Sequence, residues 1–186
     1  MSALCDVAIT AIATAFTEGV RRAPELRDLD DRLRTPGASF VTLEHGPELL
    51  GCVGALEASQ PLGIDIAEHA LAAAFDDPRM PPLSPADFPV MAVKVSVLST
   101  PEPLAVTSFA QLRAVVRTGI DGLTVELPNR RATLLPSVWE KVRDPDDFLD
   151  ALWHKAGLPP RAWPAGLQVS RYTTTEECDR GPRAPV

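Results

Sequence analysis

Apolar residues recur at helical spacing near the start of the chain. Residues 4–20 place five of them on one stripe of a helix: Cys5, Ile9, Ile12, Phe16 and Val20. Cys5 shares this stripe with larger apolar side chains, so we interpret it as a small core residue. Residues 21–34, which interleave acidic and basic side chains, are predicted to form a solvated connector.

The pattern becomes strand-like after residue 37. Residues 40–43 and 49–54 are apolar runs on either side of a Gly-Pro turn, which predicts a hairpin. Residues 91–99 alternate regularly and form the clearest predicted strand of the chain. The side chains that alternate toward one of its faces are Met91, Val93, Val95 and Val97.

A helix is predicted between these strands, at residues 61–75. One of its faces carries mostly small residues, which would allow close packing against a sheet: Ala67, Ala70, Leu71, Ala74 and Phe75. Residues 76–89 are predicted to be a loop, because prolines remove the amide donors that a regular ladder needs. These prolines are Pro78, Pro81, Pro82, Pro85 and Pro89.

The second half of the chain carries further short elements. Asp144 and Pro145 are typical of the N-cap and first turn of a helix, and Gly157 is typical of its end. The other predicted elements are a helix at 108–116, a hairpin of 123–127 with 132–135, a last strand at 167–172 and a disordered tail at 177–186.

Helices and strands therefore alternate irregularly, with two hairpins and no sustained βαβ pattern. This mixture indicates an α+β fold rather than a doubly wound parallel sheet. We expect one domain over residues 4–176, with an antiparallel-rich sheet that contains residues 49–54 and 91–99. Helices at 4–20 and 61–75 are expected to pack on that sheet.

Composition narrows the class of protein. The chain has 186 residues, 45% of them hydrophobic, and a net charge of -7, so it is globular and repels the phosphates of nucleic acids. No apolar run approaches the roughly 20 residues that span a bilayer, and no leader pattern precedes the first helix. We therefore expect a cytoplasmic protein with no nucleic-acid or membrane partner.

Metal and cofactor motifs are missing from the sequence. The three cysteines are far apart and the three histidines show no ligand spacing, so we expect neither a disulfide framework nor a metal site. The chain also has no GxGxxG, GxxxxGK[ST] or GxSxG motif. We expect no intrinsic cofactor.

One stretch of the predicted hairpin has chemical character. Gly51 and Gly54 enclose Cys52 on a strand, where glycine is unfavourable unless something approaches closely. The approaching group could be a ligand or a partner backbone near the thiol. Alternatively, tight packing alone could require small residues, and Cys52 would then be one of them.

Several segments, in consistent order, resemble signatures of the AMMECR family. Residues 50–54 (LGCVG) are similar to its LRGCIG signature, and residues 72–80 (AAAFDDPRM) to its AAxxDPRF segment. Further matches are 95–99 with SVLS, 119–123 with G-x-DGL, 134–138 with LPQV, and 155–158 with KAGL followed by Trp163. The resemblance covers about residues 4–176.

This resemblance implies an α+β fold of two intimately packed subdomains. It also implies possible partners, since prokaryotic members are associated with a Memo-type protein and a radical S-adenosylmethionine protein. It brings no established activity, because the family's biochemical function is not established. The signature cysteine invites an enzymatic interpretation, and a human relative invites a regulatory one.

The chain departs from the family pattern at a few positions. The most important is Leu50, where the signature has an arginine, because a neighbouring cation favours the nucleophilic thiolate. The loss of that cation weakens a catalytic interpretation of Cys52. The other departures are Met80, Lys94 and Ser137.

Candidate partners of Cys52 follow from these segments. A cysteine nucleophile needs a base or a positive field, and His69 is the first choice of base because its helix follows the cysteine strand. Its position on the polar side of that helix is, however, more typical of a surface histidine. Asp77 and Arg79 could bind a ligand, with Arg79 clamping a carboxylate or phosphate, or could simply fix the loop.

Two hypotheses follow from these residues. In the first, Cys52, lined by Gly51, Gly54 and Arg79, forms a ligand-binding or enzymatic site that acts with partner proteins. In the second, the protein is a non-catalytic interaction or regulatory module, and the Gly-Cys strand is an exposed docking edge.

Overall fold

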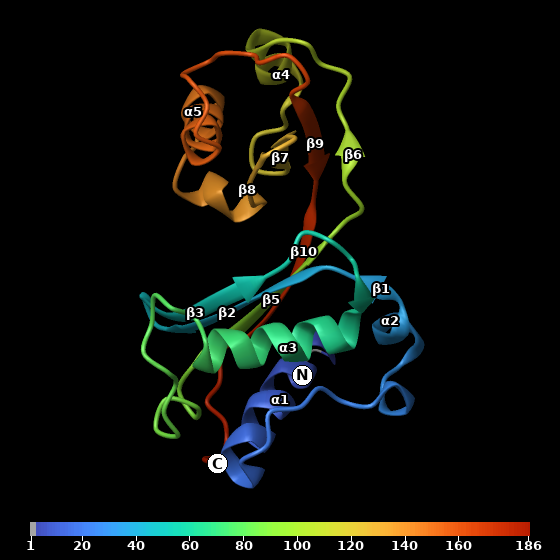
Figure 1. Cartoon of the computed structure of the whole chain (residues 1–186). Helices are drawn as coiled ribbons and strands as arrows, with labels where there is room; N and C mark the ends of the chain where they lie inside the picture. Colours follow the sequence, from blue (N-terminus) through green and yellow to red (C-terminus); the bar gives the residue numbers. More distant parts are fainter. Residues whose placement is uncertain (1–2) are drawn as a thin grey trace. The chain divides into compact units, whose positions relative to one another are not determined.

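The computed structural model describes residues 3–186, which form two compact units. Unit 1 combines the described residues up to Leu98 with Thr175–Val186, and unit 2 is Ser99–Thr174. The chain thus leaves unit 1 after one strand and returns to it in another (Figure 1). Each unit has its own sheet and its own cluster of buried apolar side chains.

Unit 1 is built on a four-stranded sheet with the spatial order β10-β5-β2-β3. The strands are β2 (Ser39–His45), β3 (Glu48–Gly54), β5 (Ala92–Leu98) and β10 (Thr174–Asp179). β2 pairs antiparallel with both β3 and β5. Gly46 suits the β2–β3 turn because its φ is 58°, which side chains disfavour. The predicted hairpin is therefore confirmed.

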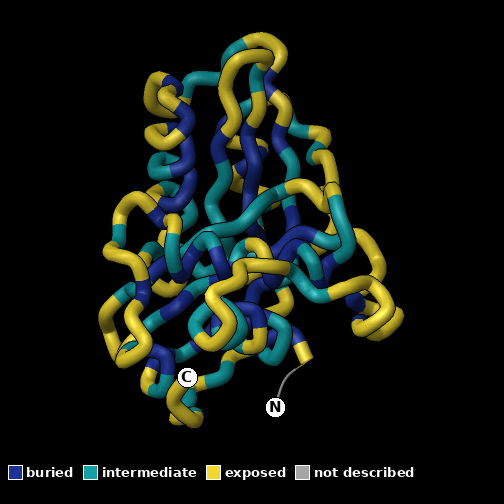
Figure 2. The backbone as a smooth tube through the Cα atoms, turned by 60° about the horizontal axis from the view of Figure 1, so that its bottom comes forward, coloured by how far each residue is buried: buried dark blue, intermediate teal, exposed yellow. Residues whose placement is uncertain are grey.

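Helices α1 (Ala3–Glu18) and α3 (Leu62–Phe75) cover one face of this sheet (Figure 1). Their apolar side chains and those of alternate strand positions form one core, which includes Leu4, Cys5, Ile12, Val41, Leu43, Ile66, Val93 and Val95, all fully buried. Burial is concentrated in the strands and the packed helices, whereas the connecting loops are mostly exposed (Figure 2). This layer of helices on an antiparallel sheet confirms the sequence-based expectation.

The connector at residues 21–34 contains more structure than the sequence predicts. It holds η1 (Leu26–Asp28) and α2 (Asp31–Arg34). Asp30 caps α2, since its Oδ1 accepts a hydrogen bond of 2.9 Å from the N–H of Leu33, and Leu33 is buried. Two buried leucines among charges, Leu29 and Leu33, are too few to show a period. The connector is followed by β1 (Pro36–Gly37), which pairs with β4 (Gln60–Pro61).

Unit 2 has a second four-stranded sheet, with the order β6-β9-β7-β8. Its strands are β6 (Glu102–Pro103), β7 (Gly122–Leu127), β8 (Arg130–Leu134) and β9 (Gln168–Tyr172). β7 pairs antiparallel with β8 and β9. The predicted second hairpin is confirmed, with a two-residue turn shorter than expected.

The helices of unit 2 begin where the sequence predicts. They are α4 (Phe109–Val115) and α5 (Pro145–Lys155), accompanied by the 3₁₀ segment η2 (Pro136–Glu140). The Asp144 side chain caps α5 by accepting a 2.7 Å hydrogen bond from the N–H of Asp146. Gly157 follows the helix with a φ of 64°, as expected of a C-terminal glycine.

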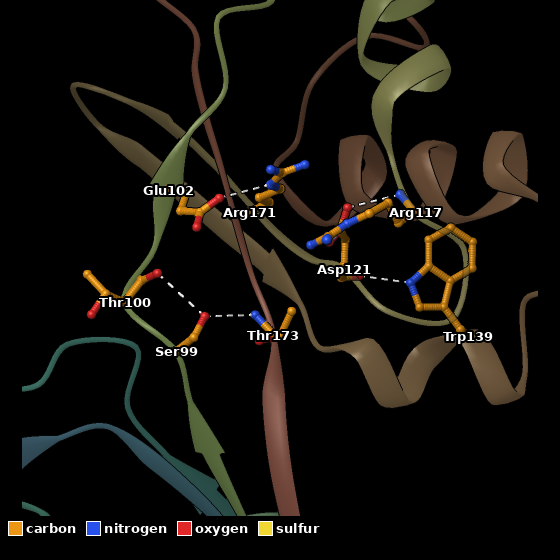
Figure 3. A network of polar contacts seen from close by, with 8 residues as sticks. All are labelled: Ser99, Thr100, Glu102, Arg117, Asp121, Trp139, Arg171 and Thr173. Carbon is orange, nitrogen blue, oxygen red and sulfur yellow. Dashed lines mark hydrogen bonds and ion pairs between the residues drawn. The ribbon is translucent and has the colours of Figure 1, made fainter.

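A buried polar network organises unit 2 around the 119–123 segment (Figure 3). The carboxylate of Asp121 is fully buried and accepts hydrogen bonds from the main chain and the guanidinium of Arg117. The carbonyl of Asp121 accepts a 2.8 Å hydrogen bond from Nε1 of Trp139, whose ring stacks on Phe148 with centroids 3.8 Å apart. This segment therefore holds structural contacts, and Trp139 anchors packing in unit 2.

The end of the chain is held more firmly than the expected disordered tail at 177–186. β10 continues to Asp179, and the N–H of Arg183 donates to the carbonyl of Pro89 at 3.0 Å. The Arg183 guanidinium also donates to the carbonyl of Met91 at 2.7 Å, across 92 residues of sequence. A local pattern gives no sign of partners so distant. Among the helices of residues 3–186, none has the length and apolarity needed to span a membrane.

Candidate functional site

Strand alternation places Cys52 on the sheet face opposite the helices of unit 1. In β2, Val41 and Leu43 point into the core under α1 and α3, so Thr42 between them faces the other way. Cys52 pairs directly with Thr42 and therefore shares its face. The thiol is half-buried, unlike fully buried Cys5. It is thus accessible from that face of the sheet.

Polar side chains form a row across the strands on this face. Thr42 pairs with Cys52 on one side and with Lys94 on the other. The Thr42 hydroxyl donates a hydrogen bond of 3.3 Å to the sulfur of Cys52. At the far end, Nζ of Lys94 lies 4.0 Å from Oε2 of Glu176, and Ser96 Oγ donates to that carboxylate at 2.8 Å. The side chains of Cys52, Thr42, Lys94 and Glu176 therefore form a row of a thiol, a hydroxyl, an amine and a carboxylate, which we call the Cys52 row.

The loop after α3 holds the backbone of Cys52 at the free edge of the sheet. β3 is an edge strand, so alternate residues point N–H and C=O groups away from β2. The N–H of Cys52 donates to Oδ2 of Asp77 at 3.0 Å, and the C=O of Cys52 accepts from Nη2 of Arg79 at 2.8 Å. Asp77 and Arg79 together occupy the place that a neighbouring strand would take.

Asp77 and Arg79 also bind each other in a bidentate ion pair. Nε of Arg79 donates to Oδ1 of Asp77 at 2.9 Å, and Nη2 donates to Oδ2 at 2.7 Å. These hydrogen bonds from Arg79, followed by that from the Cys52 amide, hold the pKa of Asp77 far below its ordinary value. The same contacts raise the pKa of Arg79, to which the Cys52 side chain contributes a smaller part. The cation near the thiol is thus Arg79.

The contacts of the Arg79 guanidinium test the hypothesis that Arg79 clamps a carboxylate or phosphate of a ligand. The edge of the Arg79 guanidinium that could bind an anion in a bidentate way is already bound to Asp77. The Asp77 side chain is only 2% exposed, whereas the Arg79 side chain is 59% exposed. Because much of the Arg79 side chain is exposed, a ligand anion could contact it without breaking the pair. Fixing the loop is the role that these contacts favour.

Both glycines beside Cys52 are approached closely by the protein itself. A Cβ at Gly51 would lie 2.0 Å from the carbonyl oxygen of Ala73 in α3. A Cβ at Gly54 would lie 2.3 Å from the ring of Phe40 and 2.5 Å from the carbonyl oxygen of Ser39. This geometry favours the packing alternative for both glycines. Their role in ligand binding stays a prediction.

His69 takes no part in the contacts made by Cys52. Its side chain is also less exposed than the sequence predicted. Its side chain is 15% exposed, and Nδ1 lies 3.2 Å from Oδ2 of Asp65, although without hydrogen-bond geometry. That Asp65 oxygen accepts hydrogen bonds from the N–H and hydroxyl of Ser39, at 2.8 and 2.6 Å. Among residues 3–186, no hydrogen bond or ion pair joins His69 to Cys52. His45 and His154 are exposed.

A family model described as AMMECR1 matches residues 5–176, which is nearly the whole chain. The chain belongs to the AMMECR1 family. A protein of Methanothermobacter thermautotrophicus is 43% identical over 150 residues, covering 78% of each chain. A protein of Thermofilum pendens is 35% identical over 183 residues, covering 92% of this chain and 86% of the relative.

The fold is also found in a solved structure. The crystal structure of the uncharacterized protein PH0010 from Pyrococcus horikoshii matches with a TM-score of 0.87 and 31% identity. The match covers 98% of this chain and 92% of that chain. It confirms the α+β fold with antiparallel sheets.

In this AMMECR1 protein, two distant signature segments meet at one place. The cysteine strand and the Asp77-Pro78-Arg79 segment are 25 residues apart and join through the Cys52 amide. Leu50, which stands where the AMMECR signature has arginine, packs against the core of unit 1. Arg79, which belongs to the DPRF segment of the signature itself, is therefore the cation that remains beside the Cys52 backbone.

The sequence did not reveal that Thr42, Lys94 and Glu176 lie in one row with Cys52. The sequence shows only that each is a polar residue in a strand, at a position that faces away from the core. Knowing which outward positions are neighbours requires the register, and the β2–β3 register contains an irregularity between Leu43 and Glu44. Within residues 3–186, no three His, Cys, Asp or Glu side chains cluster as metal ligands.

Proposed function

We propose that this AMMECR1 protein binds a small electrophilic ligand on the face of the unit 1 sheet opposite α1 and α3 and reacts with it through Cys52. The observation that carries the proposal is the hydrogen bond of 3.3 Å from the Thr42 hydroxyl to the Cys52 sulfur. It is supported by the backbone contacts from Asp77 and Arg79, which fix the position of the thiol. A half-buried thiol with a fixed backbone suits a positioned nucleophile.

The proposed chemistry uses the sulfur as nucleophile. The thiol proton passes to water, and the sulfur lone pair forms a bond to an electrophilic carbon of the ligand. The bond from that carbon to its leaving group breaks at the same time, and the leaving group departs with the electron pair and takes up the proton from water. The Thr42 hydroxyl donates to the sulfur and stabilises negative charge there before attack. Arg79 adds a positive field from the strand edge. Lys94, in the same row, is placed to receive an anionic group of the ligand.

The test is the rate at which iodoacetamide alkylates each cysteine, followed by mass spectrometry of the intact native protein. Cys178 is exposed, whereas Cys52 is half-buried, so access alone would make Cys178 react faster. We expect Cys52 to react faster than Cys178 and to be slowed by Thr42→Val. Thr17→Val, at an exposed position of α1, is the matched control. Slower alkylation of Cys52 that is insensitive to Thr42→Val would contradict the proposal.

The alternative is a non-catalytic interaction module that docks a partner strand along the edge of β3. The outer position of β3 in its sheet favours this alternative. The occupied N–H and C=O of Cys52 disfavour it, because a docking strand would have to displace Asp77 and Arg79. Cys52→Ser keeps the backbone groups and removes the nucleophile. A variant that binds partners normally and loses only ligand modification would exclude the docking alternative.

We further propose that the reaction is carried out together with a Memo-type protein and a radical S-adenosylmethionine protein. The family membership supports this pairing, and the site residues do not name the substrate. The test is co-purification from a strain that expresses all three proteins, with wild type and Cys52→Ser compared. Absence of either partner from both samples would refute the association.

A further inference from the structure

Unit 1 has a hollow that none of the residues of β3 line. It is a groove of about 610 Å³ between α1 and the segment 22–29, both drawn in blue in Figure 1. This volume is in the range that holds small organic ligands, about 300–1,000 Å³. We call it the α1 groove. It shares no lining residue with the Cys52 row.

The floor of the α1 groove is apolar. Val7, Ala11 and Ala23 line it and belong to a small buried cluster with Ala67 and Leu71 of α3. An apolar floor can bury the hydrocarbon part of a ligand, at about 25 cal/mol per Å² of surface removed from water.

The charges on the walls are unequally paired. Arg27 pairs with Glu25, with Nη2 and Oε2 2.9 Å apart, and its Nε lies 3.9 Å from Oδ1 of Asp28. Arg22 faces Glu18 at 3.6 Å. Asp6 remains, and one of its carboxylate oxygens is shielded from solvent without any hydrogen-bond partner among residues 3–186. A carboxylate that lacks donors is costly, and a cation placed beside it lowers that cost.

We infer that the α1 groove binds a small organic cation, in which an ammonium group is joined to an apolar body. The ammonium lies against Asp6 and forms an ion pair with its carboxylate at the groove wall, while the apolar body lies on Val7 and Ala11. The hydroxyls of Thr10 and Thr14 on the same helix face offer further acceptors for the N–H groups. The inference does not depend on the chemistry proposed for Cys52.

Asp6 also has an ordinary structural role, since an acid in the first turn stabilises the helix dipole. Asp147 occupies the same kind of position in α5 of unit 2 and is exposed. Asp147→Asn therefore removes an equal charge from an equivalent helix position without touching the groove. It is the matched control for Asp6→Asn.

The test is titration of the isotope-labelled protein with phenethylamine at neutral pH, followed by backbone amide chemical shifts. Phenethyl alcohol, similar in size and shape but neutral, is the comparison ligand. We expect saturable shifts confined to residues 6–14 and 22–29, with the alcohol bound at least about tenfold more weakly, a difference of ~1.4 kcal/mol. Asp6→Asn should remove the preference for the amine, and Asp147→Asn should keep it.

Thr10→Phe is a second variant that fills the groove from an exposed helix position and so spares the core. We expect it to abolish the shifts caused by the amine. Three results would overturn the inference: no saturable shifts with the amine, equal binding of amine and alcohol, or unchanged amine binding in a folded Asp6→Asn. If Asp6→Asn does not fold, Thr10→Phe and the alcohol comparison decide between the same outcomes.

Discussion

Single residues around Cys52 show how far a local pattern can be interpreted. The pattern drew attention to Gly51 and Gly54 because glycine is unfavourable in strands. It did not tell which group approaches them, and the structure places Ala73 against one and Phe40 with Ser39 against the other. The residue pattern thus located a closely packed site, and only the structure showed that α3 and β2 are the elements packed against it.

Gly51→Ala is expected to destabilise the protein strongly. The new Cβ would lie 2.0 Å from the carbonyl oxygen of Ala73, a backbone atom that only a shift of α3 could move. We expect the free energy of unfolding in urea to fall by about 1–3 kcal/mol, or more. Gly63→Ala is the comparison, because its Cβ meets flexible methyl groups of Leu29 and alanine favours the helix. Equal stability of Gly51→Ala and wild type would contradict the assigned packing.

The Asp77 carboxylate predicts an acid-dependent loss of stability. Its folded-state pKa lies below the ordinary value of 3.8, first because of Arg79 and then because of the Cys52 amide. The stabilisation is therefore fully present above that ordinary value and is lost as the pH falls toward the lower folded-state pKa. Asp77→Asn should lower the free energy of unfolding at pH 7 by about 1–3 kcal/mol and flatten its decline in acid.

The control for Asp77→Asn is its neighbour Asp76→Asn. Asp76 is 61% exposed and pairs with an exposed Arg21, so its removal should change stability little. Urea unfolding of all three proteins between neutral pH and pH 3 measures both effects. The same steep acid dependence in Asp77→Asn as in wild type would show that another group is responsible.

Elements were the scale at which sequence and structure agreed most closely. Residues 61–75 and 91–99 were predicted as a helix and a strand, and α3 and β5 occupy nearly those ranges. The short η1 and α2 were missed because so few residues cannot show a period. Their formation depends on burial of Leu33 by the rest of unit 1.

The start of α5 gives a prediction at this scale. The Asp144 side chain accepts from the N–H of Asp146 at 2.7 Å and satisfies a donor that the helix leaves unpaired. Asp144→Ala should cost about 1 kcal/mol in the free energy of unfolding. Asp147→Ala, which keeps the cap and removes an exposed acid, should cost less. A larger loss in Asp147→Ala, seen by thermal or urea unfolding, would contradict the assignment of the cap.

The two units of the molecule do not follow the order of the sequence, because unit 1 contains both ends of the described chain. Unit 1 includes Thr175–Val186, so β10 joins a sheet whose other strands lie before residue 99. The sequence predicted a last strand at 167–172 and a disordered tail at 177–186. The structure instead has β10 from Thr174 to Asp179, whose Glu176 lies in the Cys52 row, and Arg183 contacts Met91.

Metal content is the prediction that belongs to the whole molecule. Residues 3–186 hold no group of three possible ligands, and neither the cysteines nor the histidines have ligand spacing. We expect protein purified without added metal to carry far less than one equivalent of zinc, iron or copper by mass spectrometry. We also expect chelator treatment to leave the melting temperature unchanged. One equivalent of metal whose removal lowers the melting temperature would contradict this expectation.

The sequence by itself determined the four longer helices α1, α3, α4 and α5, the two hairpins, the caps of α5 and the importance of the Gly-Cys segment. Those features depend on interactions between residues close in the chain, so periodicity and turn chemistry reveal them. Only the tertiary structure decided which groups meet Cys52. Thr42, Asp77 and Arg79 reach it through the β2–β3 register and the packing of α3, across 10, 25 and 27 residues. Long-range contacts are set by register and close packing, which a local pattern does not encode.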